Sequence, residues 1–235
     1  SKVYVLKVEQ SPRGPQISVS RTHPGLVKRL YELEVPEVRD HTVEIKQIVR
    51  EPGYRCKVAV VSNNERVDPV GACVGVKGSR VQAIINELNG ERMDLISYSN
   101  DPATYIASSL SPAKVLSVTV EKDKKNALVV VADDQLSLAI GKAGQNVRLA
   151  ARLTSWHIDI KSESQMKKAK EAEFSELTKL PGVGKVTAQL LSQHGFTTLE
   201  KIASSSISEL TKISGIGQKS AEKIYKGAKK ESGIE

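Results

Sequence analysis

The chain has 235 residues, a length that allows one large domain or two to three small ones. Hydrophobic residues make up 39% of it and charged residues 26%, as in folded globular proteins, but aromatic residues make up only 4%, which excludes a function built on broad aromatic stacking surfaces. The net charge of +8 favours an anionic polymer as partner, yet it is spread along the chain without a basic block, so specific contacts must come from particular loops.

The residue types that support catalysis or metal binding are sparse and scattered. Cys56 and Cys73 stand alone, and the four histidines have no spacing typical of a metal site or a nucleophile pair. Asp133 and Asp134 follow an expected strand, and we interpret them as helix N-caps rather than metal ligands. No apolar run approaches the ~20 residues that cross a bilayer. We therefore expect a cytoplasmic protein that is not an enzyme, has no export leader, and binds no cofactor, metal or membrane.

Residues 1–20 form two short β-rich runs joined by a turn-rich segment. Two strands alone do not bury a core. We expect them to be the last hairpin of a β-domain whose remainder lies upstream.

One order of elements is expected twice: helix, strand, strand, helix, helix, strand. In the first copy these are residues 21–34, 43–50, 55–61, 70–74, 79–88 and 92–98. In the second copy they are residues 102–110, 115–122, 126–132, 135–140, 145–153 and 156–161. The sequence therefore predicts an α+β fold with two copies of one small domain, at residues 21–100 and 101–162.

Each copy contains a loop of the form Gly-X-X-Gly between its two adjacent helices, and the two loops lie 66 residues apart. The loops consist of Gly75, Val76, Lys77 and Gly78, and of Gly141, Lys142, Ala143 and Gly144. Glycines permit close approach, and the amides at the start of the following helix attract phosphate. This arrangement is typical of the KH module, whose loop clamps the backbone of single-stranded RNA. A tight helix-to-helix turn is the alternative, which duplication with a lysine in each loop disfavours.

Polar residues just after each loop are further candidates for RNA contact, with helix capping and solvation as the alternative. They are Ser79, Arg80, Gln145, Asn146 and Arg148.

The composition changes after Ser162. Residues 163–174 are polar and charged, either a linker or an exposed helix, and we assign them as a linker. A 33-residue repeat in residues 175–235 then predicts an all-α tandem helix-hairpin-helix domain. Its hairpins expose glycines and lysines that are candidates for phosphate or partner contact, namely Gly182, Gly184, Lys185, Gly215, Gly217 and Lys219. We expect Val183 and Ile216 to be buried. An equal alternative to phosphate binding is that the hairpins only pack the helices into a stable protein-binding domain.

Long segments of the chain resemble the bacterial NusA family of transcription factors. The resemblance spans residues 1 to about 162 and rests on RGPQISVSRTHPGLVKRLYELEVPEV, VREPGYRCKVAV, DPVGACVGVKGSRVQAIINELNGERMDLI and LSPAKV. It implies two tandem KH domains of bacterial (type II) topology that form one RNA surface, preceded by the end of an RNA-binding barrel of OB class. The family's polymerase-binding N-terminal domain has no counterpart here.

The resemblance also implies a function: an elongation factor that contacts nascent single-stranded RNA and modulates pausing, termination and antitermination. The implied partners are this RNA, RNA polymerase (mainly through parts absent here) and other elongation factors, and we expect a monomer. Arg55, in the family-typical turn at residues 50–55, is a candidate phosphate contact. Two alternatives remain open: a scaffold or repair accessory whose tail grips the backbone of duplex DNA, and a tail that binds only proteins.

Overall fold

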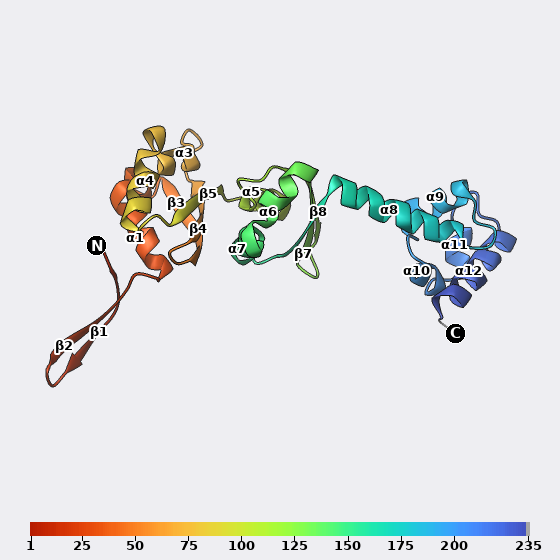
Figure 1. Cartoon of the computed structure of the whole chain (residues 1–235), viewed down its shortest axis with the longest axis horizontal. Coiled ribbons are helices and arrows are strands. Elements are labelled where there is room, and N and C mark those ends of the chain that lie inside the picture. The colour runs from red at the N-terminus through yellow and green to blue at the C-terminus, as the bar shows by residue number, and fades with distance from the viewer. Residues whose placement is uncertain (234–235) are drawn as a thin grey trace. The chain divides into compact units, whose positions relative to one another are not determined.

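The computed structural model describes residues 1–233 and divides the chain into two compact units, Ser1–Glu163 and Ser164–Glu235 (Figure 1). The first unit contains a hairpin and two small α+β domains, and the second is helical. No helix in the described part of the chain has the length and apolar character needed to cross a membrane.

The N-terminal hairpin is formed by β1 (Tyr4–Ser11) and β2 (Gly14–Ser20), which pair antiparallel as the sequence predicts. Its apolar side chains face solvent, and Ile17 is 61% exposed. At its base the Tyr4 ring stacks on the His23 ring with centroids 4.6 Å apart, and Arg21 pairs with Glu87 of α4 (Ser79–Glu87). These contacts attach the hairpin to the domain that follows it. Its membership of a barrel stays a prediction.

The two predicted α+β copies are both present, and each predicted helix and strand lies within three residues of its expected bounds. The first copy consists of α1 (Pro24–Glu34), the short α2 (Pro36–Arg39), β3 (Val43–Glu51), β4 (Arg55–Ser62), α3 (Pro69–Val74), α4 and β5 (Arg92–Ser97). The second consists of α5 (Pro102–Ser109), β6 (Val115–Glu121), β7 (Asn126–Val131), α6 (Leu136–Ile140), α7 (Gln145–Thr154) and β8 (His157–Ser162). Beyond these expected elements, the two copies contain α2 and three short 3₁₀ helices, at Val76–Gly78, Asp133–Gln135 and Lys142–Gly144.

Each copy has a three-stranded sheet of the same topology. In the first, β3 pairs antiparallel with β4, and β4 pairs parallel with β5; β6, β7 and β8 repeat this order. The helices cover one face of each sheet, where aliphatic side chains such as Val58 and Val129 are fully buried. This is the two-layer α+β arrangement of a KH domain of the bacterial topology, in two copies.

The two KH copies share a buried seam. Val49, Ala59 and Ile96 of the first sheet pack against three side chains of the second copy, which are Tyr105, Leu149 and Leu153. Lys57 is fully buried, and its Nζ donates to Asp94 Oδ2 and to the carbonyl of Ser111, with a distance of 2.9 Å for each hydrogen bond. Desolvation lowers the pKa of Lys57, and the Asp94 carboxylate opposes that shift. The seam is therefore packed and hydrogen-bonded, so the two copies form one body.

The second unit contains five helices among the described residues: α8 (Glu163–Thr178), α9 (Lys185–Gln193), α10 (Leu199–Ala203), α11 (Ile207–Thr211) and α12 (Gln218–Ser232). The charged stretch assigned as a linker is helical, since it forms the first turns of α8, so the exposed-helix alternative describes it. The 33-residue repeat is visible in the core, where Leu177 and Leu210 hold equivalent buried positions, as do Val183 and Ile216. The unit is a tandem helix-hairpin-helix domain, as predicted.

Candidate nucleic-acid interface

The two Gly-X-X-Gly loops have the same backbone conformation. Gly75 and Gly141 end the preceding helices at φ/ψ of 76/173° and 75/169°. The third loop position is left-handed in both, with φ of 52° at Lys77 and at Ala143. The last glycine is also left-handed, and the next helix starts at the following residue. The loops are therefore structural equivalents rather than chance sequence matches.

Each loop is closed by one hydrogen bond between its two glycines. The amide of Gly78 donates to the carbonyl of Gly75, and the amide of Gly144 donates to the carbonyl of Gly141, with a donor–acceptor distance of 3.1 Å in each loop. Consecutive amides in a right-handed then left-handed turn make an anion-binding concavity. The middle residues protrude, with Val76 82% exposed.

The first glycine of each loop is required by packing as well as by its backbone. A Cβ on Gly75 would lie 2.6 Å from Arg80 Cγ, and one on Gly141 would lie 2.8 Å from the backbone nitrogen of Asn146. A Cβ on Gly144 would meet nothing within 4 Å. The last glycine therefore borders open space, where a ligand backbone can approach.

The two lysines are not equivalent. Lys142 occupies the second loop position, which Val76 holds in the first loop, and Lys77 occupies the third position, which Ala143 holds in the second. Both ammonium groups belong to exposed residues. Each loop thus has one cation, but at a different position in the loop.

Asn146 is buried, contrary to its expected role in RNA contact, whereas Arg80 is engaged through Nη1 but keeps 30% of its side chain exposed, so its role stays a prediction. Asn146 is fully buried and donates from Nδ2 to the carbonyls of Leu110 and Ala139 over 2.9 and 3.0 Å. Arg80, at the equivalent place in the first copy, donates to the carbonyl of Ala72 over 2.7 Å and pairs with Glu37. Both side chains bond helix-end carbonyls behind the loop, because those carbonyls have no partner within their own helix. These hydrogen bonds hold each loop in shape.

Gln145 and Arg148 lie beside the second loop but are bound to Glu51 of the first copy. Gln145 Nε2 donates to Glu51 Oε2 over 2.7 Å, and Arg148 donates to Oε1 from Nε and Nη2 over 2.9 and 2.8 Å. The hydrogen bond from Gln145, followed by that from Arg148, lowers the pKa of Glu51. Arg148 remains half exposed, with 51% of its side chain accessible. Ser79, in the corresponding position to Gln145, is exposed.

Arg55 is paired with an acid and largely buried. Its Nε donates to Asp94 Oδ2 over 2.8 Å, and its side chain is only 11% exposed. The same carboxylate accepts from Lys57, so Asp94 neutralises two cations. The phosphate contact of Arg55 stays a prediction, and the acid that pairs with it lies 39 residues away on a neighbouring strand.

The turn before Arg55 is held by Glu91, which sequence reasoning missed. Glu91 is fully buried and receives the guanidinium of Arg50 through Nε and Nη2, over 2.6 and 2.9 Å. It also accepts from the amide of Gly53 over 2.8 Å. A glutamate after a glycine in a surface-like run gives no signal of burial, so the sequence offered no way to find it. The turn is architectural, and it places Glu51 against the second loop.

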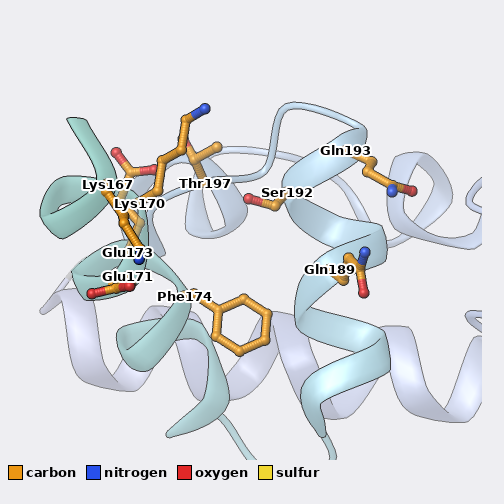
Figure 2. A pocket seen from close by; sticks show the side chains of 9 residues that line it. All are labelled: Lys167, Lys170, Glu171, Glu173, Phe174, Gln189, Ser192, Gln193 and Thr197. Atoms are coloured by element: carbon orange, nitrogen blue, oxygen red, sulfur yellow. The ribbon is translucent and has the colours of Figure 1, made fainter. Parts of the chain in front are cut away.

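The hairpins of the tail expose their glycines. Gly182 and Gly215 have positive φ, of 85° and 99°, and Lys185 and Lys219 are exposed near the starts of α9 and α12. A groove of about 700 Å³ lies elsewhere on this unit, between α8 and α9 (Figure 2). Its lining combines two lysines and two glutamates with the ring of Phe174. This mixed lining gives no basic surface for a nucleic acid.

The residue types that ligate metals are scattered over residues 1–233. Within the described range no group of three or more histidine, cysteine or acidic residues converges. Cys56 and Cys73 are free and fully buried, as small core residues are. Asp133 and Asp134 lie in the first turn of a 3₁₀ helix whose N-cap residue is Ala132, so their interpretation as N-caps is wrong, although a first-turn carboxylate still suits the helix dipole.

Comparison with protein-family models finds three adjacent matches. Residues 21–98 match a "NusA-like first KH domain", residues 102–168 a "NusA-like second KH domain", and residues 174–230 a "SAM-like Helix-hairpin-helix tandem". A solved structure titled "Crystal structure of APE1850" matches with a TM-score of 0.44 at 20% identity, over 59% of this chain and 97% of that one. That likeness is too weak to support an argument.

Three curated relatives bear the name "Transcription termination/antitermination protein NusA". Those of Halalkalibacterium halodurans and Bacillus subtilis are 61% and 60% identical over 164 and 163 residues, which is 70% and 69% of this chain and 43% and 44% of theirs. That of Rickettsia prowazekii is 44% identical over 209 residues, 86% of this chain and 42% of its own. The last match is longer than the first unit, so it extends into the tail. The chain spans less than half the length of each relative. With its two KH copies, its helix-hairpin-helix tail and these relatives, the chain belongs to the NusA family.

Proposed function

We propose that the chain is the RNA-binding part of a transcription elongation factor, which contacts nascent single-stranded RNA and modulates pausing, termination and antitermination. The observation that supports this most directly is the pair of Gly-X-X-Gly loops, which share one backbone conformation and each carry an exposed lysine. The names of the curated relatives support the transcriptional role.

The proposed mechanism is binding without chemistry. Phosphates of the RNA lie against the amides of residues 75–78 and 141–144, where Lys77 and Lys142 add charge. The bases rest on the aliphatic surface beside each loop, because aromatic residues are too few for stacking to dominate. Affinity therefore depends on phosphate contacts and falls as salt rises.

We further propose RNA polymerase and other elongation factors as protein partners, and a monomeric protein in the cytoplasm. Since the chain spans less than half of its relatives, contacts with polymerase are expected largely from segments outside it. The duplex-DNA alternative is not favoured, because the relatives are named for transcription termination and antitermination.

The test of RNA binding is fluorescence anisotropy with labelled single-stranded RNA across a salt series. We expect the variant Lys77→Asp/Lys142→Asp to bind at least about tenfold more weakly and with a shallower salt dependence, since two phosphate contacts are lost. Lys28→Asp/Arg39→Asp makes the same charge change on exposed residues of α1 and α2 and serves as the control. Unaltered affinity of the loop variant, or an equal loss in the control, would contradict the proposal.

The role of the tail is tested in the whole chain with duplex DNA. If the tail contacts only proteins, Lys185→Asp/Lys219→Asp leaves any duplex binding unchanged. A loss of duplex binding specific to this variant would bring the DNA alternative back.

A further inference from the structure

One carboxylate of the first KH copy holds the polar residues that follow the RNA loop of the second. Glu51 Oε2 accepts from Gln145, and Oε1 accepts twice from Arg148, all between 2.7 and 2.9 Å. Arg148 also donates from Nη1 to the carbonyl of Ala143, over 3.1 Å. Hydrogen bonds thus run without a break from the β3–β4 turn of the first copy to the backbone of the second loop.

The residues at the Glu51 end of this hydrogen-bonded connection are held in place by buried contacts. The turn that bears Glu51 is fixed by the buried carboxylate of Glu91, which accepts from the amide of Gly53. The side chain of Glu51 is itself only 23% exposed. A guanidinium bound at two nitrogens by one carboxylate has a defined plane, unlike a flexible surface ion pair.

Arg148 keeps hydrogen-bonding capacity after these contacts. A guanidinium has five N–H donors, and three of them are used here, by Glu51 and by Ala143. The remaining two belong to a side chain that is half exposed beside the loop. The arrangement therefore leaves a cation oriented next to the loop, at the carbonyl of Ala143.

We infer that Glu51 is a positioning residue for the RNA loop at residues 141–144, acting through Arg148 and Gln145. The inference rests on the proposed RNA-binding function. It predicts a change in RNA affinity on removal of the Glu51 charge that is opposite in sign to the change expected from net charge alone. Removing an acid near an RNA site should strengthen binding if only net charge matters. If Glu51 orients Arg148 and the loop, removing its charge weakens binding instead.

The experiment measures the affinity of the full chain for single-stranded RNA by anisotropy, with Glu51→Gln as the variant. We expect an affinity about threefold to tenfold weaker, the range typical of coupled polar neighbours. Glu44→Gln is the matched control, because Glu44 lies on the same strand and pairs only with exposed Lys46. Equal or tighter binding by Glu51→Gln would overturn the inference.

A second variant separates positioning from a purely structural role. Arg148→Lys keeps the charge but not the guanidinium plane, so adding Glu51→Gln to it should cost little more RNA affinity. Fully additive losses would overturn the inference. Amide NMR resonances of Ala143 and Gly144 should also shift in free Glu51→Gln and stay unchanged in Glu44→Gln; unshifted resonances would count against it.

The two proposals fail in different ways. If the wild-type chain binds no RNA, or binds it without dependence on Lys77 and Lys142, the proposed function fails. If binding depends on those lysines but Glu51→Gln binds as tightly as wild type, only the inference about Glu51 fails.

Discussion

The guanidinium of Arg50 and the carboxylate of Glu91 meet side by side in the interior, with 4% and 0% of their side chains exposed. Both oxygens of Glu91 are used by Arg50, and the third nitrogen of Arg50 donates to the carbonyl of Arg21 over 2.8 Å. Such a pair offsets its desolvation cost only while both partners are present. It ties the start of α1, the β3–β4 turn and the start of β5 together.

Breaking this pair should destabilise the first unit strongly. We expect Glu91→Gln to lower its free energy of unfolding by about 3 kcal/mol or more, because the Arg50 charge is left buried without its counter-charge. The only tryptophan, Trp156, lies in this unit, so urea unfolding followed by its fluorescence measures the effect. Glu44→Gln, in an exposed pair, should cost less than about 1 kcal/mol. Similar values for the two variants would contradict the prediction.

The two glycines of the second loop should respond differently to alanine. Gly144→Ala should cost about 1 kcal/mol, the penalty of a left-handed backbone, because the added Cβ meets open space. Gly141→Ala adds a clash with the backbone of Asn146 at 2.8 Å, which cannot move away as a side-chain tip can. Urea unfolding of both variants should rank Gly141→Ala as clearly less stable, and equal stability would show that the loop relaxes freely.

The thiols should be unreactive in the folded protein. Desolvation by burial raises the pKa of Cys73 to about 12 and raises that of Cys56 as well. A higher pKa leaves less thiolate, the reactive form, at about pH 8. Iodoacetamide labelling read by mass spectrometry should therefore modify neither cysteine until the chain is unfolded in urea. Rapid labelling of the native protein would contradict this expectation.

The Glu51 contacts should make stability depend on pH in a defined direction. Hydrogen bonds from Gln145 and Arg148 lower the pKa of Glu51 in the folded state. Their stabilisation is therefore complete above the ordinary glutamate pKa of ~4.3 and is lost as the pH falls through the lowered value. The difference in unfolding free energy between wild type and Glu51→Gln should shrink on acidification, as Trp156 fluorescence in urea series can measure. A difference that does not change with pH would contradict the prediction.

The repeats were predictable because their signals are local. The 66-residue recurrence of Gly-X-X-Gly between two helices, and the 33-residue recurrence of glycine hairpins with buried Val183 and Ile216, follow from backbone preference and hydrophobic spacing. Both were confirmed by the fold. The sequence shows which loop position each lysine occupies. Only the structure shows that the two lysines differ in backbone conformation, because the left-handed residue is Lys77 in one loop and Ala143 in the other.

The side-chain partners were not predictable, since burial is decided by contacts far apart in the chain. Asn146 and Arg80 have the polarity of exposed first-turn residues, yet both are used behind their loops, and Arg55 is paired across strands with Asp94. Glu51 is the reverse case, an ordinary turn residue that reaches Arg148, 97 residues later. The sequence alone determined which modules form and where each loop lies, because those depend on neighbouring residues. The tertiary structure alone decided which charges remain free beside the loops, because a charge leaves water only where packing supplies its partner.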